Sequence, residues 1–476
     1  MHERKTTGRV PYPHQEAGAR FLRDRPGAIL ADEQGVGKTD TAVHAVVQGG
    51  MWPCLVVCPA NVRVIWERVF GAVAPWVKVA LPGMMADIAQ GEVVVVSFNR
   101  LAEWLAPLAA RSFAVLIVDE AHLIRNAGEL RAAEKRALEW SVERGLHHSM
   151  HRTEAALEIA KGIPVVWALT GTPILSRPVQ LFNVLRLIRH PLSRSFREYA
   201  ERYCAGGKTI YGVEAAGCSR PTELRAATSS VLMRRRKADV LELPPKEIVR
   251  LEIPLIGEAR ERYMRVWSEH VARAKALKSV NGLRRLTGAK AIAQPTLMRE
   301  VLSNAKTPYI LEHGLRRPGP GKTVLLSNFR SSLELASRYL DRVGVEYVVY
   351  HGGISEKAKT KAVDAFAADA RKRWFLGNSV SAMVGINLTA ADRLYFADMF
   401  FTSGDHDQAA DRIHRIGQTQ PVTVYYGVCP GTIDDLQYRL LEESKKVVSD
   451  VMDGVADERW LSHDIEDTFL NSLAAV

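Results

Sequence analysis

The stretch "ADEQGVGKT" contains residues whose types and spacing suit the binding of a phosphate group. Such a loop presents backbone N–H groups to the anion, and it needs residues without side chains at its tightest bends. Gly35 and Gly37 supply these bends around Val36. Lys38 supplies a positive charge, and the hydroxyl of Thr39 can ligate Mg²⁺. The helix expected to start here would direct the positive end of its dipole at the same anion.

A second candidate is "LIVDEAH", in which two acidic residues follow an apolar run. The carboxyl end of a buried strand is where open α/β sheets bind their ligands. Asp119 could hold a Mg²⁺ ion there, and Glu120 could orient and deprotonate an attacking water molecule. The alternative is an Asp-Glu pair that only caps a helix. The phosphate loop upstream, at the end of a different strand, favours the binding site over this alternative.

The third candidate is "QAADRIHRIGQ" (408–418). On a helix, Gln408, Asp411, Arg412 and Arg415 would share one face, because they recur at spacings of three and four. Two guanidinium groups one turn apart suit a phosphate whose charge rises in a transition state. Taken alone, the segment could equally be a solvated helix face.

The elements that must position these residues follow an alternating pattern. Short apolar runs typical of buried strands alternate with helix-like stretches such as Lys38–Val47 and Asn61–Phe70, which predicts parallel sheets covered by helices. The expected strands are 27–30, 54–58, 93–97, 114–120 and 165–170, then 323–327, 346–350, 373–377, 393–398 and 422–426.

Between these two groups of strands the pattern lapses. Residues 185–306 are rich in arginine and mostly helical in periodicity, with a break at "LPPK" (243–246). "RRPGPGK" (316–322) is typical of a turn or linker, and we expect it to lead into the second group. The predicted fold class is therefore α/β, with two parallel-sheet domains flanking a basic, mostly helical insert.

The basic charge is concentrated in this middle region. From Arg186 to Leu325 there are 28 Lys and Arg against 13 Asp and Glu, whereas the whole chain carries a net charge of +11. A basic track for a polyanion is one interpretation, because neutralised phosphates release counterions and favour binding. A solvated basic face is the other, and charge alone does not decide between them.

Other features of the composition place the chain among soluble proteins. No apolar run approaches the length of about 18 residues that a membrane-spanning helix needs. The first ten residues lack the apolar core of a signal peptide, and the five cysteines are thinly spread, which favours reduced thiols in a cytoplasm. We expect a cytoplasmic protein without a membrane partner, associated with the nucleoid, or nuclear in a eukaryote.

Together these segments resemble the motifs of a superfamily-two, Swi/Snf-like DNA-dependent ATPase. The resemblance runs from about Val10 to Leu441. "PYPHQEAGARFL" resembles the Q motif, "ADEQGVGKT" motif I, in which an Asp such as Asp32 is usual, and "VVCPANV" motif Ia. "DEAH" resembles motif II, "LTGTP" motif III, and "VLLSNFR" with "YHGG" motif IV and its sequel. "AMVGINLTAADRLYFAD" resembles motif V, and "QAADRIHRIGQ" motif VI.

The resemblance implies RecA-like lobes with ATP and Mg²⁺ between them, and a role for each matching residue. Gln15 would read adenine, and Gln408 and Gly385 would also contact the nucleotide. Arg412 and Arg415 would reach the triphosphate held by the first lobe only when the lobes close. The implied coupling residues are His122, Thr170, Thr172, Asn387 and Thr389.

The resemblance also implies domain boundaries. These are an N-terminal ATPase lobe (1–190), a basic helical insert (191–305), a C-terminal lobe (306–445) and a helical tail (446–476). The insert "FREYAERYCAGG…VLMRRRKADVLELPPKE" is similar to the compact annealing-helicase, fork-remodelling branch.

Two segments depart from the family: "MFFTSGDHDQ" replaces a Trp-Asn-Pro, and Ala382 and Met383 replace paired glycines of motif V. In the family both regions help to couple ATP hydrolysis to movement on DNA. The departures therefore concern this coupling more than ATP binding.

The implied function is an ATP-driven translocase that grips duplex or forked DNA by its phosphates, with little sequence preference, and works as a monomer. An RNA-dependent ATPase, a nuclease with a helicase motor, and a module that binds ATP without turnover remain as alternatives. Of these, we expect the nuclease least, because the motifs occupy nearly all of these 476 residues.

Overall fold

The computed structural model describes most of the chain in two compact units. The described residues are 9–83, 88, 91–124, 152–171, 178–206, 208–209, 212–213, 215, 218–278, 289–316, 321–378, 386–400 and 403–453. Of the described residues, those up to Leu241 and 447–453 group with the first unit, and Glu242–Lys446 form the second. None of the helices in these described ranges is both long and apolar enough to cross a lipid bilayer.

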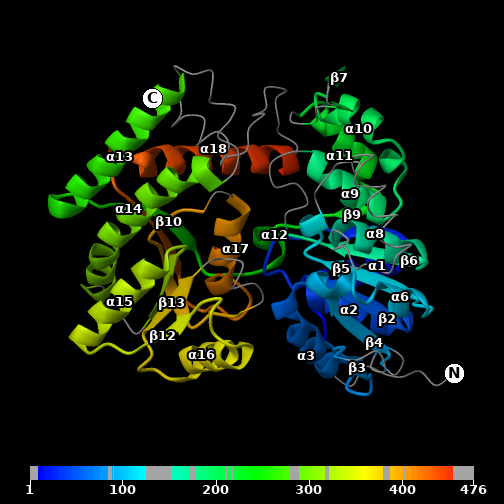
Figure 1. The fold of residues 1–476 in the computed structure, drawn as a ribbon. Helices are drawn as coiled ribbons and strands as arrows, with labels where there is room; N and C mark the ends of the chain where they lie inside the picture. The colour runs from blue at the N-terminus through cyan, green and yellow to red at the C-terminus, as the bar shows by residue number, and fades with distance from the viewer. Residues whose placement is uncertain are drawn as a thin grey trace. The chain divides into compact units, whose positions relative to one another are not determined.

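The first unit is built on a sheet in which every described strand pair is parallel (Figure 1). Its strand order is β3-β4-β2-β5-β6-β1-β9. The strands are β1 (Gly27–Leu30), β2 (Cys54–Cys58), β3 (Val79–Ala80), β4 (Val93–Ser97), β5 (Val115–Asp119), β6 (Val165–Leu169) and β9 (Leu232–Met233). A separate antiparallel hairpin joins β7 (Lys208–Thr209) and β8 (Gly212–Val213).

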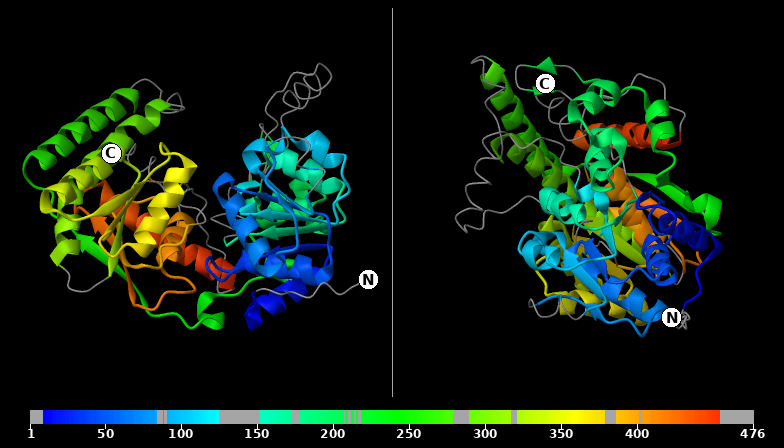
Figure 2. Two further views of the ribbon diagram at one scale, coloured as in Figure 1. Left: turned by 90° about the horizontal axis from the view of Figure 1, so that it is seen from below. Right: turned by 90° about the vertical axis from the view of Figure 1, so that its right-hand side faces the viewer.

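Helices cover both faces of this sheet (Figure 2). The helices of this unit are α1 (Pro13–Arg23), α2 (Lys38–Gly49), α3 (Arg63–Val73), α5 (Phe98–Leu101), α6 (Leu105–Ala109), α8 (Arg152–Lys161), α9 (Val179–Leu187), α10 (Phe196–Tyr203), α11 (Pro221–Thr228) and α12 (Lys237–Val240). Short 3₁₀ turns occur at Ala60–Val62, Ala121–Ile124 and Pro191–Ser193.

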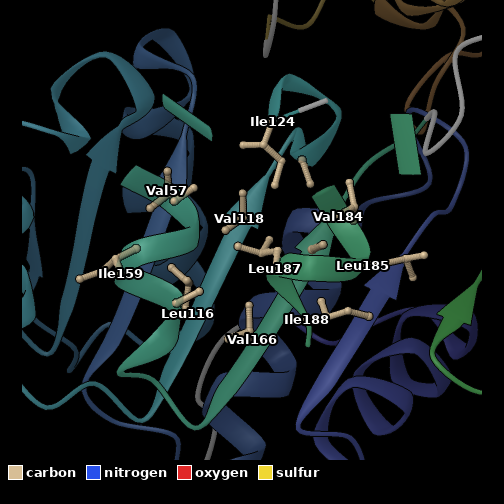
Figure 3. Packing of buried hydrophobic residues seen from close by; sticks show 14 of the residues in the cluster. Val57, Leu116, Val118, Ile124, Ile159, Val166, Val184, Leu185, Leu187 and Ile188 are labelled. Atoms are coloured by element: carbon tan, nitrogen blue, oxygen red, sulfur yellow. The ribbon is translucent and has the colours of Figure 1, made fainter. Parts of the chain in front are cut away.

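The core of the first unit lies between the sheet and the helices α8 and α9. Figure 3 shows Leu116 and Val118 of β5 and Val166 of β6 against Ile159 of α8 and Leu187 of α9. Strands buried on both faces are near-continuous apolar runs, and that is the pattern from which the sequence predicted them. Predicted and observed strands agree to within one or two residues at each end.

The second unit contains a six-stranded sheet, also parallel in every described pair, in the order β10-β15-β14-β11-β13-β12. Its strands are β10 (Lys246–Glu252), β11 (Lys322–Ser327), β12 (Tyr347–Tyr350), β13 (Trp374–Asn378), β14 (Ala391–Phe396) and β15 (Val422–Val428). Its helices are α13 (Gly257–Lys278), α14 (Ala289–Arg316), α15 (Arg330–Val343), α16 (Glu356–Ala368), α17 (Ser403–Ile413) and α18 (Ile433–Asp453). The predicted fold class of two parallel α/β lobes is confirmed.

The segment expected to be a basic helical insert is divided between the two units. Residues up to Leu241 group with the first unit and those from Glu242 with the second, so the boundary lies beside "LPPK" rather than at "RRPGPGK". Two strands within this segment explain the division. β9 pairs with β1 of the first sheet, and β10 pairs along its whole length with β15 of the second. The alternating residues of "EIVRLEI" indicate the strand β10, but the sequence analysis expected helix in this segment.

A buried ion pair joins three elements of the second unit. The ammonium group of Lys306, in α14, is fully buried and donates to Asp434 Oδ2 at 2.7 Å and to the carbonyl oxygen of Gly427 at 2.9 Å. Asp434 also accepts a hydrogen bond from the backbone N–H of Cys429 at 3.0 Å. Each charge is thus paired and hydrogen-bonded, which is the condition for burying it.

Lys306→Met should lower the free energy of unfolding of the second unit by about 3 to 5 kcal/mol, because it leaves the Asp434 carboxylate buried without its partner. Urea denaturation followed by circular dichroism measures the change. Arg316→Met in the same helix is the matched control, since Arg316 is 77% exposed and its ion-pair partner Glu312 is 48% exposed. The control should change stability by about 1 kcal/mol or less. Equal losses in both variants would contradict this account of the pair.

Candidate functional site

The loop between β1 and α2 has the backbone that its glycines predicted. Gly35 and Gly37 lie in the left-handed region, with φ of 82° and 95°. A Cβ atom at Gly37 would lie 2.3 Å from Nε2 of Gln15 and would displace that amide, and the left-handed φ disfavours any residue other than glycine there. The helix α2 starts at Lys38, and its first N–H groups have no acceptor within the helix. The loop and the helix N-terminus together form a cradle for an anion.

Lys38 and its neighbours set the charge of this cradle. The side chain of Lys38 is buried, and its ammonium group donates to the carbonyl oxygens of Asp32 at 2.9 Å and Glu33 at 3.2 Å. Thr39 follows directly, in the first turn of α2. The positive charge is therefore held at the loop itself.

Asp32, which replaces the outermost glycine of the strict loop pattern, has a clear structural role. Its carboxylate is fully buried and forms an ion pair with Arg235, whose Nε lies 3.0 Å from Asp32 Oδ1. The same guanidinium group donates to the carbonyl oxygen of His14. Nearby, Glu33 Oε2 accepts the backbone N–H of Lys237 at 2.8 Å. The segment after β9 thus fixes the outer half of the phosphate loop.

Asp119 and Glu120 stand at the end of β5, as predicted, and both are buried. Burial, together with the neighbouring charge of Glu120, raises the pKa of Asp119 to about 6. A hydrogen bond from Trp66 Nε1 to Asp119 Oδ2, at 2.9 Å, acts in the opposite direction. Glu120 has φ of 50°, a backbone conformation that residues other than glycine rarely adopt and that is common at functional sites.

Three separate segments meet at the carboxylate of Glu120. From the phosphate loop, Gln34 Nε2 lies 3.3 and 3.4 Å from its two oxygens. His122 Nδ1 lies 3.3 Å from Glu120 Oε2 and 3.3 Å from Thr170 Oγ1, at the end of β6. The structure therefore brings together the loop, the strand end and the start of the "TGTP" segment. Thr172 lies outside the described residues.

The helix α1 places Gln15 against the same loop. Its Oε1 accepts the backbone N–H of Tyr12 at 3.0 Å, while its Nε2 is buried and has no hydrogen-bond partner among the described residues. His14 Nε2 donates to the carbonyl oxygen of Val36 at 3.0 Å. The Q-motif segment is thus bonded to the phosphate loop on one side and carries an unsatisfied donor beside it.

The second unit carries the remaining predicted residues. Gln408 and Arg412 lie on α17, and both are largely buried. The prediction that Arg415 shares their helix face is wrong, because α17 ends at Ile413 and a turn with Gly417 at φ of 100° follows. Arg415 Nη1 instead donates to the carbonyl oxygen of Ile386 at 3.5 Å.

Gln418 is a residue of this region that the sequence analysis did not single out. Its Nε2 lies 2.8 Å from the carbonyl oxygens of Ala391 and Ile413 and 3.3 Å from that of Thr389. The carbonyl oxygen of Arg412 accepts the N–H of Leu388 at 2.9 Å. Motifs V and VI are therefore joined by a backbone hydrogen bond and by the side chain of Gln418.

The coupling residues of motif V are described in part. Asn387 Oδ1 accepts the N–H of Thr389 at 3.3 Å. Gly385, with the altered positions Ala382 and Met383, lies outside the described residues.

The segment "MFFTSGDHDQ" places the ring of a histidine in the core of the second unit. His406 is fully buried, and its ring centroid lies 4.6 Å from that of Phe396, 5.1 Å from Phe400 and 5.2 Å from Tyr426. Its Nε2 accepts the N–H of Phe400 at 3.0 Å. The ring of His406 thus fills the core between β14 and α17.

Comparison with known families agrees with this arrangement. The model described as SNF2-related domain matches residues 14–142 and 150–305, which is more than half of the chain. The chain belongs to the SNF2-related family. The model of the helicase conserved C-terminal domain matches residues 305–417, which include motifs IV to VI. The predicted family is confirmed.

The chain is similar to several curated proteins. It is 29% identical to the SWI/SNF-related matrix-associated actin-dependent regulator of chromatin subfamily A-like protein 1 homolog of Caenorhabditis elegans, over 92% of this chain and 61% of that one. It is 26% identical to the DNA annealing helicase and endonuclease ZRANB3 of Bos taurus, over 93% of this chain and 40% of that one. The chain thus spans about half the length of such relatives. The Sulfolobus solfataricus SWI2/SNF2 ATPase core in complex with dsDNA matches 95% of both chains, with a TM-score of 0.43 and 20% identity.

The residues around Asp119 fit a Mg²⁺ ion. Among the described residues, no group of three or more His, Cys, Asp or Glu side chains could bind a metal ion. Mg²⁺ usually takes one or two protein ligands and completes its shell with water and substrate phosphates. A buried carboxylate with a raised pKa, together with the Thr39 hydroxyl, suits this mode, because a cation would compensate the desolvated charge.

The raised pKa of Asp119 predicts a pH dependence of stability. Between its unfolded value of 3.8 and its folded value of about 6, the folded protein binds a proton that the unfolded chain has lost. Stability from this group is therefore present at low pH and is lost as the pH rises through 6. Relative to Asp119→Asn, the metal-free protein should lose about 2 to 3 kcal/mol of unfolding free energy between roughly pH 4 and pH 7.

Urea titrations of both proteins across this range measure the difference. The altered hydrogen bonds of the amide add an offset that does not depend on pH, so only the pH-dependent part is diagnostic. A difference that stays constant, or that grows in favour of the wild type with rising pH, would show that the carboxyl pKa is not raised.

Proposed function

We propose that this chain is an ATP-dependent motor that hydrolyses ATP to ADP and phosphate and couples hydrolysis to movement on DNA. One observation carries the proposal. Within the first unit, the left-handed glycines of the phosphate loop and Lys38 lie at the same sheet edge as Asp119 and Glu120. A chain with this edge and a helicase C-terminal domain has the parts that the reaction requires.

Each residue of the first unit has a defined role in the proposal. Gly35, Val36, Gly37 and Lys38 contact the phosphates, with the lysine as a point charge. Gln15 contacts adenine through its unsatisfied amide donor. Thr39 and Asp119 bind Mg²⁺, which, when bound, neutralises charge on the phosphate oxygens.

Glu120 is the group that acts on the attacking water. It accepts hydrogen bonds that orient the water, and it takes a proton as the nucleophile attacks. Its burial keeps competing solvent away and strengthens its interaction with the water.

The second unit supplies the residues that make hydrolysis depend on closure. Arg412 and Arg415 stabilise the charge that develops on the terminal phosphate, and Gln408 and Gly385 add further nucleotide contacts. Because these arginines belong to a different unit, hydrolysis depends on closure of one unit on the other. The coupling residues His122, Thr170, Thr172, Asn387 and Thr389 relate this closure to the bound nucleic acid.

The proposed partner is duplex or forked DNA, bound without sequence preference by a monomeric motor. The excess of basic residues between Arg186 and Leu325 supports it, because phosphate contacts carry no sequence information. One group of relatives is named for DNA annealing, which supports fork remodelling or strand annealing as the form of the movement. A nucleoid or nuclear location follows from the same partner.

Lys38→Ala and Glu120→Gln should each reduce DNA-stimulated ATP hydrolysis by about a hundredfold or more, because the first loses a phosphate contact and the second the proton acceptor. Both should bind DNA as the wild type does. Steady-state phosphate release with duplex, single-stranded and forked DNA, and with RNA, measures the effect. Activation by RNA alone would favour an RNA-dependent ATPase, and ATP binding without turnover in the wild type would favour a binding module.

Stimulation by DNA should weaken steeply with salt, because each neutralised phosphate releases counterions. The DNA concentration for half-maximal ATPase should rise about a hundredfold between 50 and 200 mM salt if roughly four phosphates are contacted. Titrations at four salt concentrations give the slope. A half-maximal DNA concentration that is independent of salt would contradict a phosphate-gripping motor.

A further inference from the structure

Gln34 lies in the phosphate loop, and the proposed function assigns no role to its side chain. It lies between Glu33 and the first left-handed glycine, and its side chain is partly buried. Its Nε2 lies 3.3 Å from Glu120 Oε1 and 3.4 Å from Glu120 Oε2. A single amide group is thus shared by both oxygens of the carboxylate that is proposed to activate water.

The same side chain occupies a space that the sequence leaves open at Gly171. A Cβ atom added to Gly171 would lie 2.7 Å from Nε2, 2.8 Å from Cδ and 2.8 Å from Cγ of Gln34. The amide of Gln34 therefore lies directly over the backbone of the "TGTP" segment. The end of a flexible side chain fills the space, so a methyl group at Gly171 would push the amide aside rather than break the backbone.

The carboxylate of Glu120 needs such a restraint. Another neighbour is the imidazole of His122, 3.3 Å from Oε2, which in turn lies 3.3 Å from the hydroxyl of Thr170. A long carboxylate side chain has several rotamers, and proton transfer requires one orientation within hydrogen-bond reach of the water. A neutral amide orients a carboxylate without placing a cation beside it, so the carboxylate remains a usable proton acceptor.

We propose that Gln34 is a positioning residue for Glu120, and that Gly171 lacks a side chain to give the Gln34 amide its place. The inference rests on the proposed function, because it assumes that Glu120 acts on the attacking water. In this arrangement the loop that binds the phosphates also sets the orientation of the proton acceptor. A shift of the loop would therefore move both together.

The first test replaces Gln34 by Met, which has similar length and packing but no hydrogen-bond donor. For Gln34→Met, kcat of DNA-stimulated ATP hydrolysis should fall about tenfold or more, since misplacement of a catalytic group is costly. KM for ATP and the affinity for a fluorescent ATP analogue should stay within about twofold, because the loop backbone is unchanged. Gln48→Met is the matched control, since Gln48 lies on the exposed face of α2 and donates to Glu16 at 2.7 Å.

A double-substitution cycle tests the contact with Gly171. Gly171→Ala in the wild type should lower kcat about as much as Gln34→Met, because the methyl group displaces the amide. In a Gln34→Ala protein the space is empty, so Gly171→Ala should cost less than about twofold more. Such non-additivity is expected only for groups that act through one contact. Melting temperatures of all variants check that the fold is retained.

The outcomes separate this inference from the function on which it rests. Loss of turnover in Glu120→Gln with normal kcat in Gln34→Met overturns the positioning role alone. Effects of Gln34→Ala and Gly171→Ala that multiply independently also overturn it, as does a fall in analogue affinity that matches the fall in kcat. A wild-type protein that binds ATP without turnover overturns both the proposed function and the inference.

Discussion

The parallel pairing of β1, β6 and β5 is the constraint on which the first unit depends. Strands that run in one direction have their carboxyl ends at one edge, so the segments that follow them must meet there. The register aligns Leu30 with Leu169 and Leu169 with Asp119. Segments as far apart in sequence as Gln34 and Glu120 are therefore brought within hydrogen-bond distance. Apolar burial of three short strands, joined by backbone hydrogen bonds, creates this edge.

The edge carries unfavourable local features that the surrounding structure tolerates. Two acidic side chains are buried next to each other, and the backbone of Glu120 has an unusual left-handed conformation. The ammonium group of Lys38 donates to carbonyl oxygens of its own loop, which leaves it placed at the anion cradle. Charges of both signs are thus fixed a short distance apart before any ligand binds. Such preorganisation is what electrostatic catalysis requires.

Much of the fold could be predicted because its signal is local. Ten of the strands are mostly apolar runs, and the phosphate loop and the Asp119–Glu120 pair follow two of these runs directly. The strand β9 was missed because its two residues are too few to show a period, and β10 because its alternating residues lie in a segment that was assigned to helix. Arg415 was placed on a helix by its spacing from Arg412, although the helix ends before it.

The contacts within the site were the least predictable part. The ion pair between Asp32 and Arg235 joins residues 203 positions apart, and the Trp66–Asp119 hydrogen bond spans 53 positions. No periodicity in the sequence relates such residues. Gln34 and Gln418 lie within motifs I and VI, but their residue type did not indicate a contact, because most glutamines are exposed. These residues are recognised only once the strand order is known.

The most direct test of the central claim is a crystal or cryo-EM structure of the full chain with Mg²⁺, a non-hydrolysable ATP analogue and duplex DNA. The account predicts the triphosphate on the N–H groups of residues 35–39, Glu120 facing the terminal phosphate, and the guanidinium groups of Arg412 and Arg415 on the same phosphate. A nucleotide bound elsewhere would contradict it, as would a DNA-bound complex in which both arginines face away from the triphosphate.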